Sequence, residues 1–177
     1  ETRGEPKYTM KFCTWGGEEQ GLHGSKAYVG QYQPELQENL RIYINLDMNH
    51  VDIDYETRGN GVWMFGNDRR DTQHIEGIVK EFESQNPRGL ASIYDINVDT
   101  LDGPKNGPNG MPYNSDHGPF VYDIQREEGD DPGRALVCYG SGSWEYHTYH
   151  DDMDRFNAES LAVSGIIYGS YAAWLAW

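Results

Sequence analysis

The sequence predicts an α/β protein of three layers, with a mostly parallel or mixed central sheet between two layers of helices. Two observations predict it. Strand-like and helix-like segments alternate along the chain, and the strands are continuously apolar, which is typical of a sheet covered on both faces. The chain has 177 residues, enough for one domain with a core but not for two, so residues 1–177 are expected to form a single domain.

The strands are predicted from runs of apolar and β-branched or aromatic residues that end at turn residues. The first run (YTMKFCTW, 8–15) stops at Gly16-Gly17. Further strands are expected at 40–48, 62–65, 92–98 and 134–139. The second of the five strands ends abruptly in polar residues, of which Asp47 is the first.

The helices are predicted from capping residues followed by apolar residues at helical spacing. A short helix is expected over 25–32, followed by a second turn that Pro34 opens. Asp71 is expected to cap a helix that reaches Ser84. Asn157 is expected to cap a last helix that reaches Trp174. Residues 102–114 are rich in Gly, Pro and Asn and are expected to form a long loop, which in compact domains is often functional.

The chain is strongly acidic, with 14 Lys plus Arg against 29 Asp plus Glu and a formal net charge of −15. This charge argues against binding to nucleic acid or to an anionic membrane. No apolar run has the length of about 20 residues that a transmembrane helix needs. The two cysteines, Cys13 and Cys138, each lie within a predicted strand and are expected to be buried free thiols.

Residues that could act in catalysis or metal binding follow the ends of three predicted strands. In sheets of this kind, ligands bind at the carboxyl ends of the strands. Glu18 and Glu19 follow the first strand, Asp47 ends the second, and Tyr146-His147 follow the strand at 134–139. Carboxylates and a neutral imidazole together suit a zinc ion. Taken singly, each has an ordinary alternative: exposed acids, a strand-end acid that caps a helix, or a surface histidine.

The tripeptide Ser115-Asp116-His117 contains the residue types of a serine hydrolase triad. Adjacent residues on one loop rarely reach triad geometry, which is built from distant segments. A serine hydrolase that uses Ser115 or Ser141 would also be expected to carry a G-x-S-x-G turn, and the sequence has none. We therefore do not favour this class.

Four motifs follow one another between residues 12 and 157, so that together they span almost the whole chain: FCTWGGEEQGLHGSKAYV (12–29), INLDMNH (44–50), SDHGPF (115–120) and YHTYHDDMDRFN (146–157). Together they resemble the two-zinc aminopeptidase family, which also contains glutamate carboxypeptidases and transferrin-receptor-like proteins. The resemblance implies a zinc-dependent exopeptidase of the aminopeptidase type that hydrolyses peptide bonds with a metal-activated water. It also implies two zinc ions in a complete site.

The resemblance assigns roles position by position. Glu18 matches the general base, and Tyr146 matches the residue that hydrogen-bonds the oxyanion. Glu19 and His147 match ligands of one zinc ion, and Asp47 matches a ligand of the other. The loop 115–117 matches a segment that lines the substrate pocket.

The chain departs from the family pattern before its first predicted strand. In the family, a His and a metal-bridging Asp precede that strand, whereas only seven residues precede Tyr8 here. The chain is therefore expected to be the C-terminal portion of a zinc peptidase domain that lacks the N-terminal strands, with little activity by itself. The missing ligands are expected from the N-terminal segment of the same precursor or from another chain, and an apolar sheet edge is expected near residues 8–15.

The expected partner in the reaction is a peptide substrate. The acidic balance fits a protein from a salty environment as well as a secreted one, and an extracellular or cell-surface location is expected. The alternative function, from another class, is a non-catalytic binding or structural module on the same fold. The presence of all five site residues argues against it, because such a module has no physical need for them.

Overall fold

The computed structural model describes residues 4–48, 60–127, 132–140, 145–150 and 152–177. Its strands are β1 (Tyr43–Leu46), β2 (Gly61–Gly66), β3 (Asp95–Thr100) and β4 (Ala135–Gly140). Its helices are α1 (His23–Gln31), α2 (Gln33–Asn39), α3 (Arg69–Gln85), α4 (His117–Tyr122) and α5 (Ala158–Ala176), with short 3-10 helices η1 (Pro87–Ser92) and η2 (Met153–Arg155). No helix in these ranges is long and apolar enough to cross a membrane.

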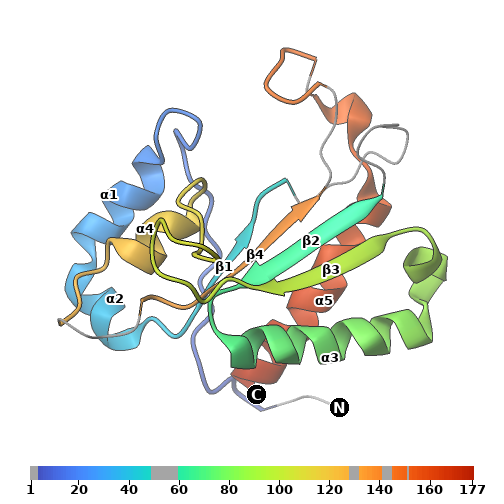
Figure 1. The fold of residues 1–177 in the computed structure, drawn as a ribbon, viewed down its shortest axis with the longest axis horizontal. Coiled ribbons are helices and arrows are strands. Elements are labelled where there is room, and N and C mark those ends of the chain that lie inside the picture. The colour runs from blue at the N-terminus through green and yellow to red at the C-terminus, as the bar shows by residue number, and fades with distance from the viewer. Residues whose placement is uncertain (1–3, 49–59, 128–131, 141–144, 151) are drawn as a thin grey trace.

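The four strands form one mixed sheet in the order β1-β4-β2-β3. Strand β4 pairs parallel with β1 and antiparallel with β2, and β2 pairs parallel with β3. Helices α3 and α5 lie along one side of the sheet, and α1, α2 and α4 gather on the other (Figure 1). The predicted α/β class with a mixed sheet is confirmed, and the arrangement is compatible with three layers.

The core divides between the two faces because successive side chains of a strand point to opposite sides. Val62 and Met64 of β2 and Cys138 of β4 pack with α3 and α5 in the larger apolar cluster. Phe65 and Val137, which alternate with them, pack with α4 in a second cluster. Both faces of the central strands are thus covered, as their continuously apolar sequences indicate.

The predicted strand at 8–15 is wrong. These residues form no strand in the structure, and Met10 is 42% and Phe12 92% exposed. A strand exists only through its hydrogen bonds to a neighbour, and no described strand pairs with this segment. Cys13, predicted to be buried, is exposed for the same reason, whereas Cys138 is buried and free as predicted.

The segment is held at its end by Trp15 and in its middle by Lys11, whose Nζ lies 2.5 Å from Oε1 of Glu35. The Trp15 ring packs against Tyr28 and Phe120, with ring centroids 5.1 and 5.8 Å apart, respectively. Apolar side chains near 8–15 are therefore exposed as expected, but they belong to an unpaired segment rather than to a sheet edge. In the described sheet the edge strands are β1 and β3.

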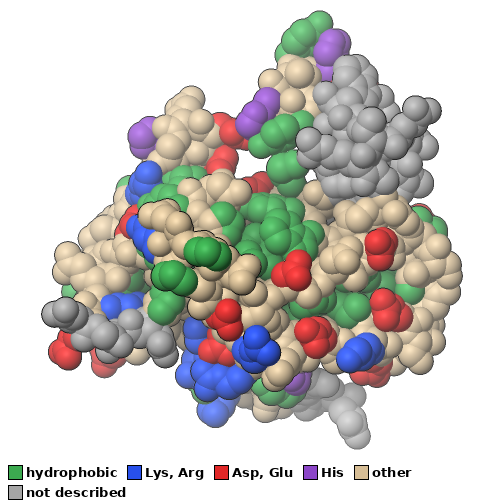
Figure 2. All heavy atoms as spheres, in the orientation of Figure 1, with side chains coloured by type: hydrophobic (Ala, Val, Ile, Leu, Met, Phe, Trp, Pro, Cys, Tyr) green, Lys and Arg blue, Asp and Glu red, His purple; other side chains and the backbone are tan. Residues whose placement is uncertain are grey.

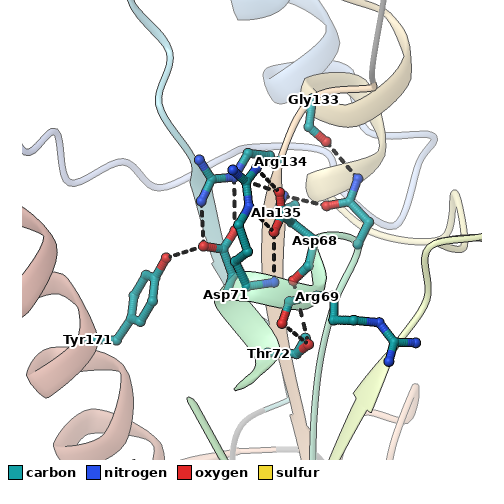
Figure 3. A network of polar contacts seen from close by, with 10 residues as sticks. Asp68, Arg69, Asp71, Thr72, Gly133, Arg134, Ala135 and Tyr171 are labelled. Carbon is teal, nitrogen blue, oxygen red and sulfur yellow. Dashed lines mark hydrogen bonds and ion pairs between the residues drawn. The ribbon is translucent and has the colours of Figure 1, made fainter. Parts of the chain in front are cut away.

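The predicted cap of α3 is also wrong. Asp68, not Asp71, caps the helix, and its carboxylate accepts from the backbone N–H of Arg70 at 2.8 Å. Asp71 lies in the first helical turn, 4% exposed, where it accepts from Nε of Arg134 at 2.9 Å and from the Tyr171 hydroxyl at 2.7 Å (Figure 3). Asp71 thus forms a buried ion pair with Arg134, 63 residues away, and does not cap the helix.

Other elements differ from the predictions mainly at their ends. The strand expected at 92–98 begins at Asp95, because η1 occupies the residues before it, and the short helix α4 was not predicted. Asn157 caps α5 as predicted, and its side-chain oxygen accepts from two backbone N–H groups of the first turn, those of Glu159 and Ser160.

Candidate active site

The parallel pairing of β1 and β4 brings together two of the predicted site segments. The carboxyl ends of parallel neighbours lie at the same edge of a sheet, so Asp47 after β1 lies beside the chain that leaves β4. The backbone N–H of Gly140 at the end of β4 donates to the carbonyl of Met48 at 2.5 Å. Tyr146 and His147 follow shortly after in the sequence.

The loop with the two glutamates is fixed to the start of α1 by backbone hydrogen bonds. The carbonyls of Gly16 and Gly17 accept from the N–H groups of Gly24 and His23 at 2.9 and 3.1 Å. A Cβ on Gly24 would meet the Gly16 carbonyl oxygen at 2.8 Å, so only glycine permits this approach. The Glu18 carbonyl accepts from Leu22 N at 2.9 Å, which holds Glu18 and Glu19 close to the helix N-terminus.

Glu19 and His147 meet although 128 residues separate them. His147 Nε2 lies 2.8 Å from Glu19 Oε1, and both side chains are more than half exposed. The Tyr146 ring stacks on the His147 ring, with centroids 3.7 Å apart. Figure 2 shows acidic and histidine side chains close together at this upper edge of the molecule.

The charges of Asp47, Glu19 and His147, the three predicted metal ligands, act on Glu18. Partial burial raises its pKa most, the carboxylates of Asp47, Glu19 and Asp116 raise it further, and His147 lowers it. A raised pKa keeps a carboxyl nearer to the range in which it can take up and release a proton. The three residues predicted as metal ligands thus all influence the pKa of Glu18.

Asp116 adds a fourth carboxylate to this group. It is 8% exposed, and its Oδ1 atom is buried without a hydrogen-bond partner. Burial and the charge of Asp47 raise its pKa. Several carboxylates in one place repel each other unless a cation or protons neutralise them, so this cluster is suited in charge to a cation.

The donors fit zinc in kind but not in number. Carboxylate oxygen and imidazole nitrogen are ordinary zinc ligands, and a zinc site needs at least three ligands from protein in most cases. In the part of the chain that the structure describes, no group of three or more His, Cys, Asp or Glu side chains is arranged to hold a metal ion. The closest approach to such a group is the Glu19–His147 pair, and the assignment of these residues and of Asp47 as ligands stays a prediction.

Left-handed backbone also occurs in the three site segments. Leu22, Met48 and His147 have φ angles of 62°, 48° and 62°. This conformation is costly for Leu and Met, whereas His adopts it more readily. Arg88 and three asparagines away from the site have positive φ angles as well, so this conformation is not confined to the site.

The loop 115–117 does not form a serine hydrolase triad. Ser115 Oγ donates to Asp47 Oδ2 at 2.5 Å, whereas Nε2 of His117 lies 2.7 Å from the carbonyl of Pro112. His117 is fully buried, and burial lowers its pKa to about 4, so its ring is neutral at neutral pH. Ser141, the other serine considered from the sequence, lies outside the described residues.

A shallow pocket of about 310 Å³ opens beside the glutamates. It is lined by Glu18, Glu19, Gly21, Leu22, Lys26, Tyr113 and Asn114. A larger pocket of about 560 Å³ is lined from residues 102–105, 121–126 and Pro132, and none of the predicted site residues lines it. The smaller pocket is therefore the better candidate for substrate, because it contains the predicted base.

The family model described as Peptidase family M28 matches residues 1–171, almost the whole chain. The chain belongs to peptidase family M28. This confirms the family resemblance predicted from the four motifs. The M28 match includes all five predicted site residues, which lie between residues 18 and 147.

Proteins similar to this chain carry peptidase names. An "Aminopeptidase" of Pseudomonas aeruginosa (strain UCBPP-PA14) is 24% identical over 184 residues, covering 96% of this chain and 31% of that protein. A "Probable leucine aminopeptidase 2" of Aspergillus fumigatus is 43% identical over 47 residues, 27% of this chain and 9% of its own length. A "Probable glutamate carboxypeptidase" of Arthroderma benhamiae is 41% identical over 44 residues, 25% of this chain and 6% of its own.

The M28 chain thus spans about a third of the Pseudomonas protein that it matches along nearly its whole length. No solved structure matches the chain significantly.

Sequence reasoning named the candidate site residues and the loop 115–117, but it missed Asn45, which contacts this loop. Asn45, 5% exposed within β1, donates to Ser115, which in turn donates to Asp47. The available signal was an asparagine in an otherwise apolar strand, two residues before Asp47 and therefore on the same face. Only the structure shows that Ser115 lies opposite this face.

Proposed function

We propose that this chain is part of a zinc-dependent exopeptidase of the aminopeptidase type. The observation that supports this most is the 2.8 Å contact between Glu19 and His147, a carboxylate and an imidazole from distant segments beside Glu18. Membership of peptidase family M28 supports the reaction class. In this proposal Glu19 and His147 hold one zinc ion and Asp47 holds the other.

The ions, when bound, supply Lewis-acid activation of water and of the scissile carbonyl. Glu18 takes the proton from the attacking water and returns it to the leaving amine, a role that suits a carboxylate whose pKa is raised by burial and by neighbouring acids. Tyr146, which stacks on His147, donates a hydrogen bond to the oxyanion that forms. The pocket beside Glu18 receives the end of the peptide substrate.

The proposal extends to the ligands that the described residues do not supply. Glu19 and His147 make two ligands for one ion and Asp47 makes one for the other, fewer than a zinc ion usually takes from protein. The further ligands, a His and an Asp, would come from an N-terminal segment of the same precursor or from another chain. We also propose that the protein is secreted or displayed at the cell surface, a location that fits its net charge of −15.

The test measures zinc content and hydrolysis of amino-acid anilides, with and without the N-terminal segment. We expect weak zinc binding and a low rate from the 177 residues alone, and tighter binding and faster turnover when the segment is added. Glu18→Gln should abolish turnover and leave zinc bound, because it removes the base and not a ligand. Glu83→Gln, an exposed acid on α3, is the matched control and should change neither.

Each outcome bears on one part of the proposal. Zinc-loaded protein with no hydrolysis of any amino-acid anilide or short peptide would favour the non-catalytic module. Full zinc occupancy and full activity from these residues alone would show that the ligands assigned to another segment are not needed. Loss of zinc in Glu18→Gln would mean that Glu18 is a ligand and not the base.

A further inference from the structure

The outer face of helix α5, which points away from α3 and the sheet, carries no charge. Residues 160–177 contain no Asp, Glu, Lys, Arg or His, although 24% of the whole chain is charged. Four large apolar side chains of this stretch are exposed: Leu161, Ile166, Trp174 and Trp177, at 37%, 38%, 54% and 47%. A helix that is apolar on all sides is normally buried, so this face is suited to contact with a further element.

The middle of this outer face is formed by residues without bulk. Gly165 and Gly169 lie about one helical turn apart, and among the described residues nothing lies within 4 Å of a Cβ built on either. By helical geometry, Leu161 and Ile166 flank the two glycines. The face therefore has a shape that suits a second helix, whose side chains would fill the row that the glycines leave open.

The first described residues are bonded to the last turn of α5. The Trp177 indole Nε1–H donates to the carbonyl of Gly4 at 2.6 Å, and the backbone N–H of Lys7 donates to the carbonyl of Ala176 at 2.5 Å. In Figure 1 the start of the described chain lies beside the end of α5 that is marked C. A segment that precedes these residues would therefore begin beside this helix.

We propose that the outer face of α5 is the docking site of an amphipathic helix from the segment that precedes residue 1 in the precursor. This inference rests on the proposed function, which assigns such a segment. The chain covers only 31% of the Pseudomonas protein that it resembles, so a relative of that length has ample sequence for a further helix. Since α5 has 19 residues, a docked helix of about 28 Å would cover it from end to end.

A helix joined to the same chain suits this face better than a second copy of the chain does. Each copy carries a net charge of −15, so two copies repel each other. A segment joined to residue 1 begins next to the face and is therefore present there at a high effective concentration. The docked helix needs apolar side chains toward α5 and no charge opposite Ile166, because an unpaired charge buried there would be costly.

The first experiment compares the whole precursor with residues 1–177 alone, both at low salt. Ile166→Cys is introduced together with Cys13→Ser, because Cys13 is exposed whereas Cys138 is buried. A water-soluble aromatic disulfide should modify the introduced thiol about tenfold or more slowly in the precursor, since the thiol reacts there only when the docked helix opens. The matched control, Glu83→Cys at an exposed position of α3, should react at the same rate in both proteins.

A second experiment tests the same face by stability. Ile166→Lys places a charge where the helix docks, so it should lower the urea midpoint of the precursor much more than that of residues 1–177, in which this side chain is 38% exposed. Glu83→Lys introduces the same side chain on the exposed side of α3 and should affect both proteins equally. An equal effect of Ile166→Lys on the two midpoints would contradict the docked helix.

The remaining outcomes separate this proposal from its alternatives. Equal modification of Ile166→Cys in the two proteins would overturn the docking site, even in a precursor that hydrolyses amino-acid anilides. Slow modification of residues 1–177 alone that depends on protein concentration would show that a second copy covers the face, and it would also overturn the proposal. A protected thiol in a precursor without any hydrolysis would support the docking site and contradict the proposed function.

Discussion

At the scale of single residues, the position of the glutamates depends on Gly24. A methyl group there would lie 2.8 Å from the Gly16 carbonyl oxygen and 2.9 Å from its nitrogen, both backbone atoms that cannot move by themselves. We expect Gly24→Ala to destabilise the fold by about 1–3 kcal/mol and to displace the loop that bears Glu18. Urea unfolding measures the first effect, and the rate of anilide hydrolysis measures the second.

The same helix offers the control for this substitution. Nothing lies within 4 Å of a Cβ built on Gly30, also in α1. Gly30→Ala should therefore stabilise the protein by up to about 1 kcal/mol through helix propensity alone, with no change in rate. Equal stability effects of the two substitutions would contradict the close approach of Gly24 to Gly16.

A second residue-scale prediction concerns acid sensitivity at the cap of α3. Hydrogen bonds from Arg70 and the nearby Arg134 charge lower the pKa of Asp68 to about 2, against an unfolded value of about 3.9. A lowered pKa in the folded state stabilises the fold above the unfolded pKa, and this contribution is lost as the pH falls from about 4 to about 2. Urea unfolding of wild type across this range should show the loss.

Asp68→Asn keeps a capping side chain and removes the charge, so its stability should depend less on pH over the same range. The exposed strand residue Asp95 provides the control, and Asp95→Asn should retain the wild-type pH dependence. If Asp68→Asn and wild type lose the same stability on acidification, the ion pairs of Asp68 do not stabilise the fold.

At the scale of elements, the Asp71 network joins α3, α5 and the chain entering β4. Tyr171 of α5 donates to the buried carboxylate of Asp71, and Arg134, directly before β4, pairs with the same group (Figure 3). The network lies at the amino end of β4, away from the candidate active site at its carboxyl end. Its role is therefore to hold helices and sheet together rather than to take part in chemistry.

Two tyrosines of α5 allow a hydrogen bond to a charged acceptor to be compared with one to a neutral acceptor. Tyr171→Phe removes a bond to a buried carboxylate and should cost about 1.5–3 kcal/mol, whereas Tyr168→Phe removes a bond to a carbonyl and should cost about 0.5–1.5 kcal/mol. Both changes leave the ring in the core, so packing is retained. Equal losses in urea unfolding would show that the Asp71 carboxylate adds nothing to the bond from Tyr171.

At the scale of the whole molecule, the exposed apolar side chains near the start of the chain are the main association surface that we predict. Met10 and Phe12 are 42% and 92% exposed in a segment that pairs with no described strand. The net charge of −15 keeps copies apart at low salt, and screening removes this protection. We therefore expect self-association in high salt, measured by light scattering.

Replacing Met10 and Phe12 together by serine should abolish this association and change the free energy of unfolding by less than about 0.5 kcal/mol, because neither side chain contributes to the core. Met153→Ser, at a residue that is 75% exposed outside this segment, should leave association unchanged. Association that persists in the double variant would place the surface elsewhere.

The sequence alone determined the features that depend on neighbours along the chain. The apolar runs predicted strands β1, β2 and β4, and Asn157 marked the start of α5, because hydrophobic periodicity and capping act within a few residues. The motifs likewise predicted the peptidase family, which the family model confirms, and named candidates for the base and the metal ligands. These predictions needed only side-chain chemistry and local spacing.

The tertiary structure decided what depends on distant partners. Residues 8–15 have the composition of a strand but lack a described neighbour to pair with, and Asp71 has the composition of a cap but pairs with Arg134, 63 residues away. The contacts of His147 with Glu19 and of Ser115 with Asp47 likewise arise only when the sheet is assembled. Local sequence sets what a segment can form, whereas the hydrogen bonds and ion pairs that fix the choice come from groups brought near by the fold.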